Sequence, residues 1–312
     1  MTTFSSPPVL LIIFNRPDLT QRVLERLRES QPAQLFIAAD GPRPGHSTDA
    51  HMCAQARNVV NEIDWPCEVK TLFRDDNLGC KNAVSGAITW FFEQVEQGII
   101  LEDDCVPHVS FFPFCAELLK RYENHDRIMS ISGNNFQADT WHCKTSYYFS
   151  IHSHIWGWAT WRRAWRRYDG SLEQWPHLRE TPFLKELHGS DLAVNYWRNI
   201  FDKVYANEID SWGYPWTYSC WVHNGLTILP AVNLVTNIGF DERATHTKNP
   251  QAAAANLAVR PIDFPLKHPA EVMADKQADA YTTYNHFGVR PRAPLWRQFM
   301  ARARTFVAAK IK

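Results

Sequence analysis

Short apolar runs alternate with segments of helical periodicity up to residue 132 of this chain. The apolar runs predict buried strands at residues 9–14, 35–39, 69–73, 99–101 and 128–132. The segments between them predict a helix after Pro17, which suits a first helical turn, and further helices at residues 57–63, 82–92 and 111–122. Strands joined through helices pair in parallel, so this order predicts an α/β fold with a mainly parallel sheet flanked by helices.

Polar side chains follow four of the predicted strands directly. They are Asn15 and Arg16, then Asp40, then Arg74 to Asn77, and finally Glu102, Asp103 and Asp104. In sheets of this kind ligands bind beyond the carboxyl ends of the strands. We therefore expect these side chains to meet at one edge of the sheet and to form a ligand site.

The acidic triplet Glu102, Asp103 and Asp104 is the most specific of these groups. Adjacent carboxylates at the end of a buried strand repel one another and lose hydration. A hard cation such as Mg²⁺ or Mn²⁺, bridging a carboxylate to a diphosphate, would relieve that cost. The alternative is a solvated acidic loop or a helix cap at Asp104 or Ser110, because short acidic runs are common on surfaces.

The overall composition narrows the classes of function. The 312 residues include 33 Lys and Arg and 33 Asp and Glu, and this balance argues against a nucleic-acid binder. No apolar stretch approaches the roughly 18 to 20 residues that span a membrane. Residues 1–8 lack the basic and apolar regions of a signal peptide. The seven cysteines show no CxxC spacing, which indicates reduced thiols and neither a zinc site nor a disulfide framework. We expect a cytoplasmic protein.

Three nucleotide-binding signatures are absent from the sequence. No GxGxxG follows the first predicted strand, which disfavours a dinucleotide site, and no Gx4GK[ST] occurs, which disfavours a P-loop kinase. A sugar nucleotidyltransferase would need a glycine-rich, basic loop after the first strand. Asn15, Arg16 and Pro17 stand there instead.

The pattern changes from about residue 138 onward. Strand-like pieces at 147–151 and 226–229 lie among segments rich in aromatic residues, His and Arg. We expect residues 138–289 to form an α+β extension of the same domain, closing over the site built by residues 1–137. Trp156, Trp158, Trp161 and Trp165 fall within ten residues, and they suit either core packing or a platform for sugar rings.

The last stretch, residues 290–312, is basic and carries no acidic residue. Trp296, Met300, Val307 and Ile311 could share one helical face. Such a tail can lie on an anionic membrane surface. Packing on its own domain, or a frayed end, is the alternative.

Two segments of the sequence resemble a known family. VLLIIFNRPD near the start and FRDDNLGCKNAVSGAITWFFEQVEQGIILEDDC at 73–105 are similar to the GT-A class of glycosyltransferases. The closer resemblance is to bacterial polysaccharide-type transferases distantly similar to N-acetylglucosaminyltransferase I. Its further matches are Pro107 with Phe111 and Phe112, SISGNN at 130–135 and WGWATW at 156–161, and it covers residues 8 to 247 approximately. It implies a Rossmann-like GT-A fold.

The resemblance also implies roles for the donor side of the site. Asp104 would be the direct ligand of Mn²⁺ or Mg²⁺. Glu102 and Asp103 would contact the donor sugar and ribose or tune the site. The remaining donor-binding candidates are Arg16 at the diphosphate, Asp40 at the base, Arg74 and Asn77 at the third strand end, and His246 closing over the phosphates.

The acceptor side is assigned in the same way. Asp210 would be the general base of an inverting transfer, although the segment around it aligns loosely and Asp241 with Glu242 is a rival. Trp156, Trp158 and Trp212 are candidates for the acceptor side.

The family's activity is a metal-dependent inverting transfer of a sugar. The expected donor is a nucleotide diphosphate sugar, UDP-linked, and the expected acceptor is a saccharide or glycolipid of a surface polysaccharide. The alternatives are a non-catalytic nucleotide-sugar or saccharide-binding protein and, less favoured, a sugar nucleotidyltransferase. We expect no nucleic-acid partner, and membrane contact only through residues 290–312.

Overall fold

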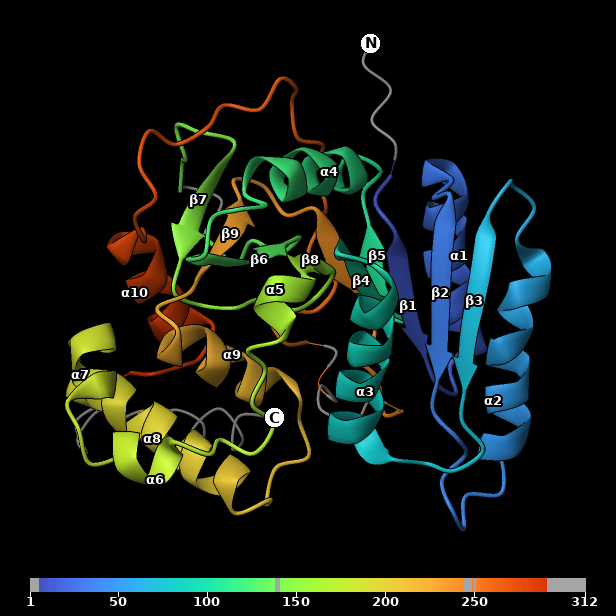
Figure 1. Cartoon of the computed structure of the whole chain (residues 1–312), viewed down its shortest axis with the longest axis horizontal. Helices are drawn as coiled ribbons and strands as arrows, with labels where there is room; N and C mark the ends of the chain where they lie inside the picture. Colours follow the sequence, from blue (N-terminus) through green and yellow to red (C-terminus); the bar gives the residue numbers. More distant parts are fainter. Residues whose placement is uncertain (1–5, 138–140, 244–248, 250, 291–312) are drawn as a thin grey trace, which may run out of the picture.

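The structure of the chain, a computed structural model, describes residues 6–137, 141–243, 249 and 251–290. An eight-stranded sheet runs through the molecule in the order β3-β2-β1-β4-β8-β6-β9-β7 (Figure 1). Its strands are β1 (Val9–Ile13), β2 (Gln34–Ala39), β3 (Glu68–Phe73), β4 (Gln97–Glu102), β6 (Ile128–Ser132), β7 (Tyr147–Ser150), β8 (Trp158–Trp161) and β9 (Leu226–Pro230). β8 runs antiparallel to its neighbours β4 and β6, and β7 runs antiparallel to β9, whereas the other pairs are parallel.

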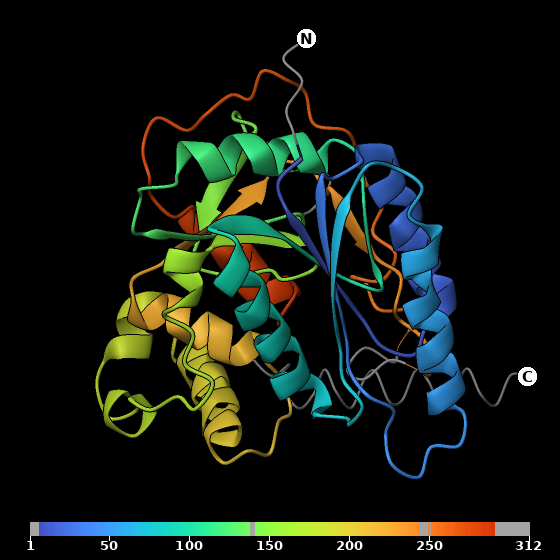
Figure 2. The same ribbon diagram turned by 45° about the vertical axis from the view of Figure 1, so that its right-hand side comes forward.

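Helices cover both faces of this sheet (Figure 2). They are α1 (Pro17–Ser30), α2 (Asp49–Arg57), α3 (Gly79–Gln94), α4 (Phe111–Arg121), α5 (Arg162–Trp165), α6 (Trp175–Leu178), α7 (Phe183–His188), α8 (Asp191–Tyr205), α9 (Gly213–Val222) and α10 (Lys276–Asn285), with a 3-10 helix at Asn58–Glu62. Along β1, Val9 and Leu11 pack with α1, α2 and α4, while Leu10 packs with α3 and α9 on the opposite face. A strand buried on both faces reads as a continuous apolar run, and the predicted α/β fold with a mainly parallel, helix-flanked sheet is confirmed.

The structure confirms some of the strands and helices predicted from the sequence and corrects others. The strands expected at 9–14, 35–39, 69–73, 99–101 and 128–132 are present within one or two residues of those bounds. The helix expected at 57–63 is wrong, because residues 49–57 form α2 and only a short 3-10 helix follows. Within the tryptophan-rich run, residues 158–161 form β8, an antiparallel strand in the middle of the sheet.

A two-stranded ribbon positions the candidate site. β5 (Cys105–Pro107) directly follows the acidic triplet and pairs antiparallel with β10 (Val235–Asn237). Asn237 lies opposite Cys105 in this pairing. The ribbon therefore brings the segment after residue 235 against the carboxyl end of β4.

The second half of the chain adds its own apolar cluster. This cluster consists of aromatic side chains from three helices: Trp175 of α6, Trp197 and Phe201 of α8, and Tyr218 and Trp221 of α9.

In the described part of the chain, we find no helix with the length and apolar character of a membrane span. The basic tail expected at 290–312 lies, apart from residue 290, outside the described residues.

Candidate functional site

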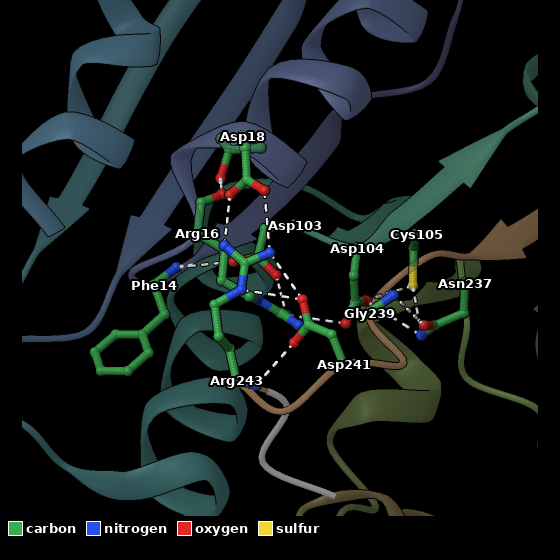
Figure 3. Close-up of polar contacts among 11 residues, drawn as sticks. Phe14, Arg16, Asp18, Asp103, Asp104, Cys105, Asn237, Gly239, Asp241 and Arg243 are labelled. Atoms are coloured by element: carbon green, nitrogen blue, oxygen red, sulfur yellow. Dashed lines mark hydrogen bonds and ion pairs between the residues drawn. The ribbon is translucent and has the colours of Figure 1, made fainter. Parts of the chain in front are cut away.

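Arg16 and the acidic triplet meet at the carboxyl ends of two neighbouring strands. Ile12 of β1 is in register with Glu102 of β4, so the residues that follow both strands emerge side by side. Nη2 of Arg16 forms ion pairs with Asp103 and with Asp104, at 2.9 Å from Oδ2 of Asp104 (Figure 3). Although burial alone lowers it, the two carboxylates raise the pKa of the Arg16 guanidinium. Arg16 therefore stays charged and fixes the two aspartates.

The triplet carries more negative charge than Arg16 balances. Burial, and then the carboxylates of Asp104 and Asp103, raise the pKa of Glu102 to about 8. Burial raises the pKa of Asp103 to about 6, although Arg16 and the backbone N–H of Phe14 oppose that shift. Crowded carboxylates with raised pKa values are typical of functional sites.

Asp104 is held from the ribbon side by residues that are distant in sequence. Nδ2 of Asn237 donates to Oδ1 of Asp104 at 3.3 Å, and the backbone N–H of Ile238 donates to the Asp104 carbonyl at 2.9 Å. Gly239 packs so closely that a Cβ there would lie 2.1 Å from Oδ2 of Asp104. Sequence reasoning missed Asn237 and Gly239, since nothing in a three-residue strand about 130 residues away indicates its partner.

The residues at the triplet fit one type of metal site and not another. Among the described residues, no group of three or more His, Cys, Asp and Glu side chains is arranged to enclose a metal ion. Mg²⁺ and similar cations are commonly held by one or two carboxylates and complete their shell with water and substrate phosphates. Asp104, with uncompensated negative charge beside it, suits that open arrangement.

A cavity of about 240 Å³, which we call the polar cavity, opens on one side of the triplet. It brings together the expected donor-side residues that the structure describes. Its polar lining is formed by Asn15, Arg16, Asp40, Arg43, Arg74, Asn77, Glu102, Asp103, Asp210 and Arg243. His246, the last of the expected donor-side residues, lies outside the described residues.

Several of these polar side chains also tie the loops of the cavity together. Both carboxylate oxygens of Asp40 lie 3.0 Å from the backbone N–H of Leu78, and burial raises the pKa of Asp40. Nδ2 of Asn77 donates to the Gly41 carbonyl at 2.8 Å. Nη1 of Arg74 donates to the carbonyl of Ala83 at 3.2 Å. The loops after β2 and β3 are therefore fixed relative to α3.

A second ion pair, between a buried aspartate and an exposed arginine, was not expected from the sequence. Asp49, which is 2% exposed, accepts hydrogen bonds from Nδ2 of Asn15 at 2.9 Å and from Nε of Arg43 at 2.6 Å. The Arg43 guanidinium, and then the Asn15 amide, lower the pKa of Asp49 to about 2 against the effect of burial. Arg43 also lies over the ring of Phe14, 5.4 Å from its centroid. This group shapes the wall of the polar cavity next to β1.

Asp210 lies at the start of α3. Its two carboxylate oxygens accept the backbone N–H groups of Cys80 and Lys81, each at 2.9 Å. Gly79, with φ of +75°, makes the turn into the helix, and a Cβ added to it would lie only 3.0 Å from Asp210. Each oxygen keeps a further lone pair, so these contacts fix the carboxylate without exhausting its capacity to accept a proton.

The loop after β10 is tied to α1 by Arg243. Its guanidinium donates to both oxygens of Asp18, at 2.9 and 3.0 Å, and to Oδ2 of Asp241 at 2.8 Å (Figure 3). Asp241, the rival candidate for the base, is thus paired with a guanidinium. Arg243 lines the polar cavity and closes it on the side of this loop.

A larger cavity of about 470 Å³, which we call the aromatic cavity, lies on the other side of the triplet. It shares Arg16, Cys80 and Glu102 with the polar cavity. Its lining further includes Asp104, Asn134, Phe136, Ser153, His154, Trp156, Trp197, Trp212, Tyr214, Thr217, Asn237, His286 and Phe287. The acids therefore stand between two cavities of different chemistry.

The three expected acceptor-side tryptophans have different surroundings. Trp156 and Trp212 line the aromatic cavity. Oδ1 of Asn134 accepts the backbone N–H of Trp156 at 3.0 Å, which holds this segment in place. The expectation for Trp158 is corrected, because Trp158 is fully buried and stacks on Trp212 with ring centroids 5.5 Å apart. It belongs to the core of the sheet.

Comparison with known proteins gives likeness of fold alone. No family model and no curated protein matches the sequence. A crystal structure of TarS 1–349 from S. aureus aligns with a TM-score of 0.40 and 12% identity, over 72% of this chain and 58% of that chain. HddC from Yersinia pseudotuberculosis aligns with a TM-score of 0.30 and 10% identity, over 50% and 77%. The inositol-1-phosphate CTP transferase from T. maritima aligns with a TM-score of 0.30 and 9% identity, over 52% and 74%.

Proposed function

We propose that the chain is a metal-dependent, inverting glycosyltransferase that moves a sugar from a UDP-sugar to a saccharide or glycolipid acceptor. One observation carries this proposal: a polar cavity and an aromatic cavity meet at three carboxylates and one arginine. A transfer between two substrates needs two adjoining sites, with the groups that stabilise the leaving diphosphate between them.

In this proposal the polar cavity holds the nucleotide. Asp40 and the loops after β2 and β3 contact the base, and Arg16 lies where the diphosphate would be. A Mn²⁺ or Mg²⁺ ion on Asp104 would neutralise the charge that develops on the leaving diphosphate. The planar guanidinium of Arg16 can donate two hydrogen bonds to phosphate oxygens at once. Glu102 and Asp103 would then face the ribose and the donor sugar.

The general base takes the proton of the attacking hydroxyl. We retain Asp210 for this role, since it lies at the wall of the polar cavity and is oriented by the start of α3. Glu102 is the alternative that the geometry adds, because it lines both cavities. We further propose that the chain acts in the synthesis of a surface polysaccharide at the cytoplasmic membrane face, and that residues 290–312 contact the membrane.

A non-catalytic sugar-binding protein would bind the same ligands without turning them over. The two functions separate in an assay of UDP release from a panel of UDP-sugars, with GDP-sugars as controls, in the presence of Mn²⁺ and of chelator. The proposal predicts Mn²⁺-dependent release from at least one UDP-sugar, accelerated by a saccharide acceptor. Binding of UDP-sugars without any release would favour the binding protein instead.

A further inference from the structure

The two ends of the aromatic cavity differ in charge. Arg16, Glu102 and Asp104 form one end, and they are the only ionic Arg, Asp or Glu side chains among the described residues that line it. Another part of the lining, which we call the far end, consists of aromatic rings and imidazoles in contact with one another: Phe136, His154, Trp197, His286 and Phe287. Arg16 is itself ion-paired with Asp103 and Asp104. Within the described lining, the far end therefore offers no Lys or Arg to bind a phosphate or a carboxylate.

His154 at this far end is buried, and neither of its ring nitrogens forms a hydrogen bond of normal geometry with a described residue. It is 4% exposed, and neither Nδ1 nor Nε2 is paired. A buried polar atom without a partner carries an energetic cost, which a ligand that pairs with it would relieve. Two residues earlier, His152 has one of its two ring nitrogens paired: Nε2 lies 3.0 Å from the hydroxyl of Thr283, while Nδ1 has no partner among the described residues. Only His154 of this pair lines the cavity.

A second unpaired donor lies in the same cavity wall. Nε1 of Trp197, a residue that is 1% exposed, has no partner within the described part of the chain. Phe136 stacks on His286 with ring centroids 3.9 Å apart and lies 4.5 Å from the ring of His154. A ligand with hydroxyl groups and an apolar face would suit this wall. Its hydroxyl groups would pair with the free polar atoms, and its apolar face would lie against the aromatic rings.

The protonation of the imidazoles favours an uncharged ligand. Burial is the main cause that lowers the pKa of His154, and it lowers the pKa of His286 to about 4. A neutral imidazole has one donor and one acceptor nitrogen. A sugar hydroxyl likewise donates one hydrogen bond and accepts others, whereas a carboxylate or phosphate only accepts.

We infer that His154 and Trp197 bind hydroxyl groups of an uncharged pyranose ring of the acceptor, which lies against Phe136 and His286. This subsite would select neutral saccharides over uronates and sugar phosphates at that position. The inference rests on the proposed function only in naming the bound sugar the acceptor. The presence of a neutral-sugar subsite can be tested without any donor.

The test measures the binding of methyl pyranosides to the full chain by saturation-transfer NMR. The probes are the methyl β-glycosides of glucose, galactose, mannose and N-acetylglucosamine, together with methyl glucuronide and galacturonide. The proteins are the wild type, His154→Phe, which removes both nitrogens, and His154→Gln, which keeps a donor and an acceptor. His125→Phe is the matched control, because His125 also has an unpaired buried ring nitrogen and packs on the ring of Tyr122 but lines neither cavity.

The inference predicts that at least one neutral glycoside binds the wild type at least tenfold more tightly than its uronide. His154→Phe should weaken that binding tenfold or more, His154→Gln should recover part of it, and His125→Phe should match the wild type. The loss of one hydrogen bond that leaves a buried partner unpaired supports a change of this size.

Three results would overturn the subsite: no glycoside binds, the uronide binds as well as the neutral sugar, or His154→Phe binds like the wild type while circular dichroism shows it folded. Titration of UDP into the wild type separates this failure from that of the proposed function. Binding of neutral glycosides without binding of UDP would support the subsite and contradict the proposed glycosyltransferase function.

Discussion

Gly239 lies where no larger side chain fits. A Cβ at this position would lie 2.1 Å from Oδ2 of Asp104 and 2.8 Å from Nη1 of Arg16. We predict that Gly239→Ala displaces the Asp104 carboxylate, at a cost of about 1–3 kcal/mol in the free energy of unfolding, and weakens Mn²⁺-dependent UDP binding. Calorimetric titration measures the change. Gly170→Ala is the control, since its nearest neighbour is the ring of Tyr168 at 3.3 Å, and equal affinities in both variants would contradict the prediction.

Asp210 combines a structural contact with the proposed catalytic role. If it is the base, Asp210→Asn should lower the rate of transfer by about 10²-fold or more and leave UDP affinity within a few-fold. Its contribution to α3 is of the capping kind and is worth about 1 kcal/mol, which thermal unfolding measures separately. Transfer at a near-wild-type rate by Asp210→Asn, together with inactivity of Glu102→Gln, would move the base to Glu102.

At the scale of the elements, α10 is attached to the sheet by a buried acid. Asp279 is 7% exposed and accepts hydrogen bonds from the Ser150 hydroxyl at 2.5 Å and the Ile151 backbone N–H at 3.3 Å. Burial raises the pKa of Asp279 to about 7, against an ordinary value of 3.8. The folded chain therefore holds a proton that the unfolded chain has lost between these values, and this group makes the free energy of unfolding fall as pH rises from about 4 to 7.

Asp279→Asn removes this dependence. We predict that the free energy of unfolding of Asp279→Asn, relative to the wild type, increases between pH 4 and pH 8, as measured by urea unfolding. Asp263→Asn, at an exposed position, serves as the control and should follow the wild type. A difference between Asp279→Asn and wild type that stays constant with pH would show that burial of the carboxylate is not what shifts its titration.

The elements that sequence patterns predict well are those whose burial is uniform. β1 and the central residues of β4 are buried on both faces, so they form unbroken apolar runs, VLLII and IIL. α2 was missed because its segment, DAHMCAQAR, has a weak apolar face with only Cys53 and Ala56 as buried apolar residues. β8 was missed because a run of alternating tryptophans and small residues suits a core strand, a helix or a surface platform equally.

The site divides in the same way. Strand ends identify Arg16, Asp40 and the acidic triplet, because parallel strands bring their carboxyl ends to one edge. The places of Asn237 and His154 in the site result from contacts between segments far apart in sequence, and no local sequence pattern predicts those contacts. The Trp158 expectation was wrong for a related reason: side chains alternate between the faces of a strand, and the composition of the run does not tell which face is covered.

At the scale of the whole molecule, the two halves of the chain share one sheet. β4 and β6 come from the first half, yet β8 from the second half lies between them, and β6 also pairs with β9. We predict that the full chain unfolds in one transition, coincident by circular dichroism and tryptophan fluorescence. A fragment of residues 1–137 should not unfold cooperatively, because β6 would lose both of its neighbours and β4 would lose β8, which exposes Ile131 and Ile99. A fragment with a dispersed NMR spectrum would contradict this view.

The central claim concerns the polar cavity and the acids that border it. The direct measurement is calorimetric titration of UDP, with GDP as control, into the wild type, Asp104→Ala and the exposed-site control Asp263→Ala, each with and without Mn²⁺. We predict that UDP binds the wild type and the control only with Mn²⁺, and that Asp104→Ala abolishes this binding. Failure of the wild type to bind either nucleotide in the presence of Mn²⁺ would contradict the account and leave the triplet as an acidic loop.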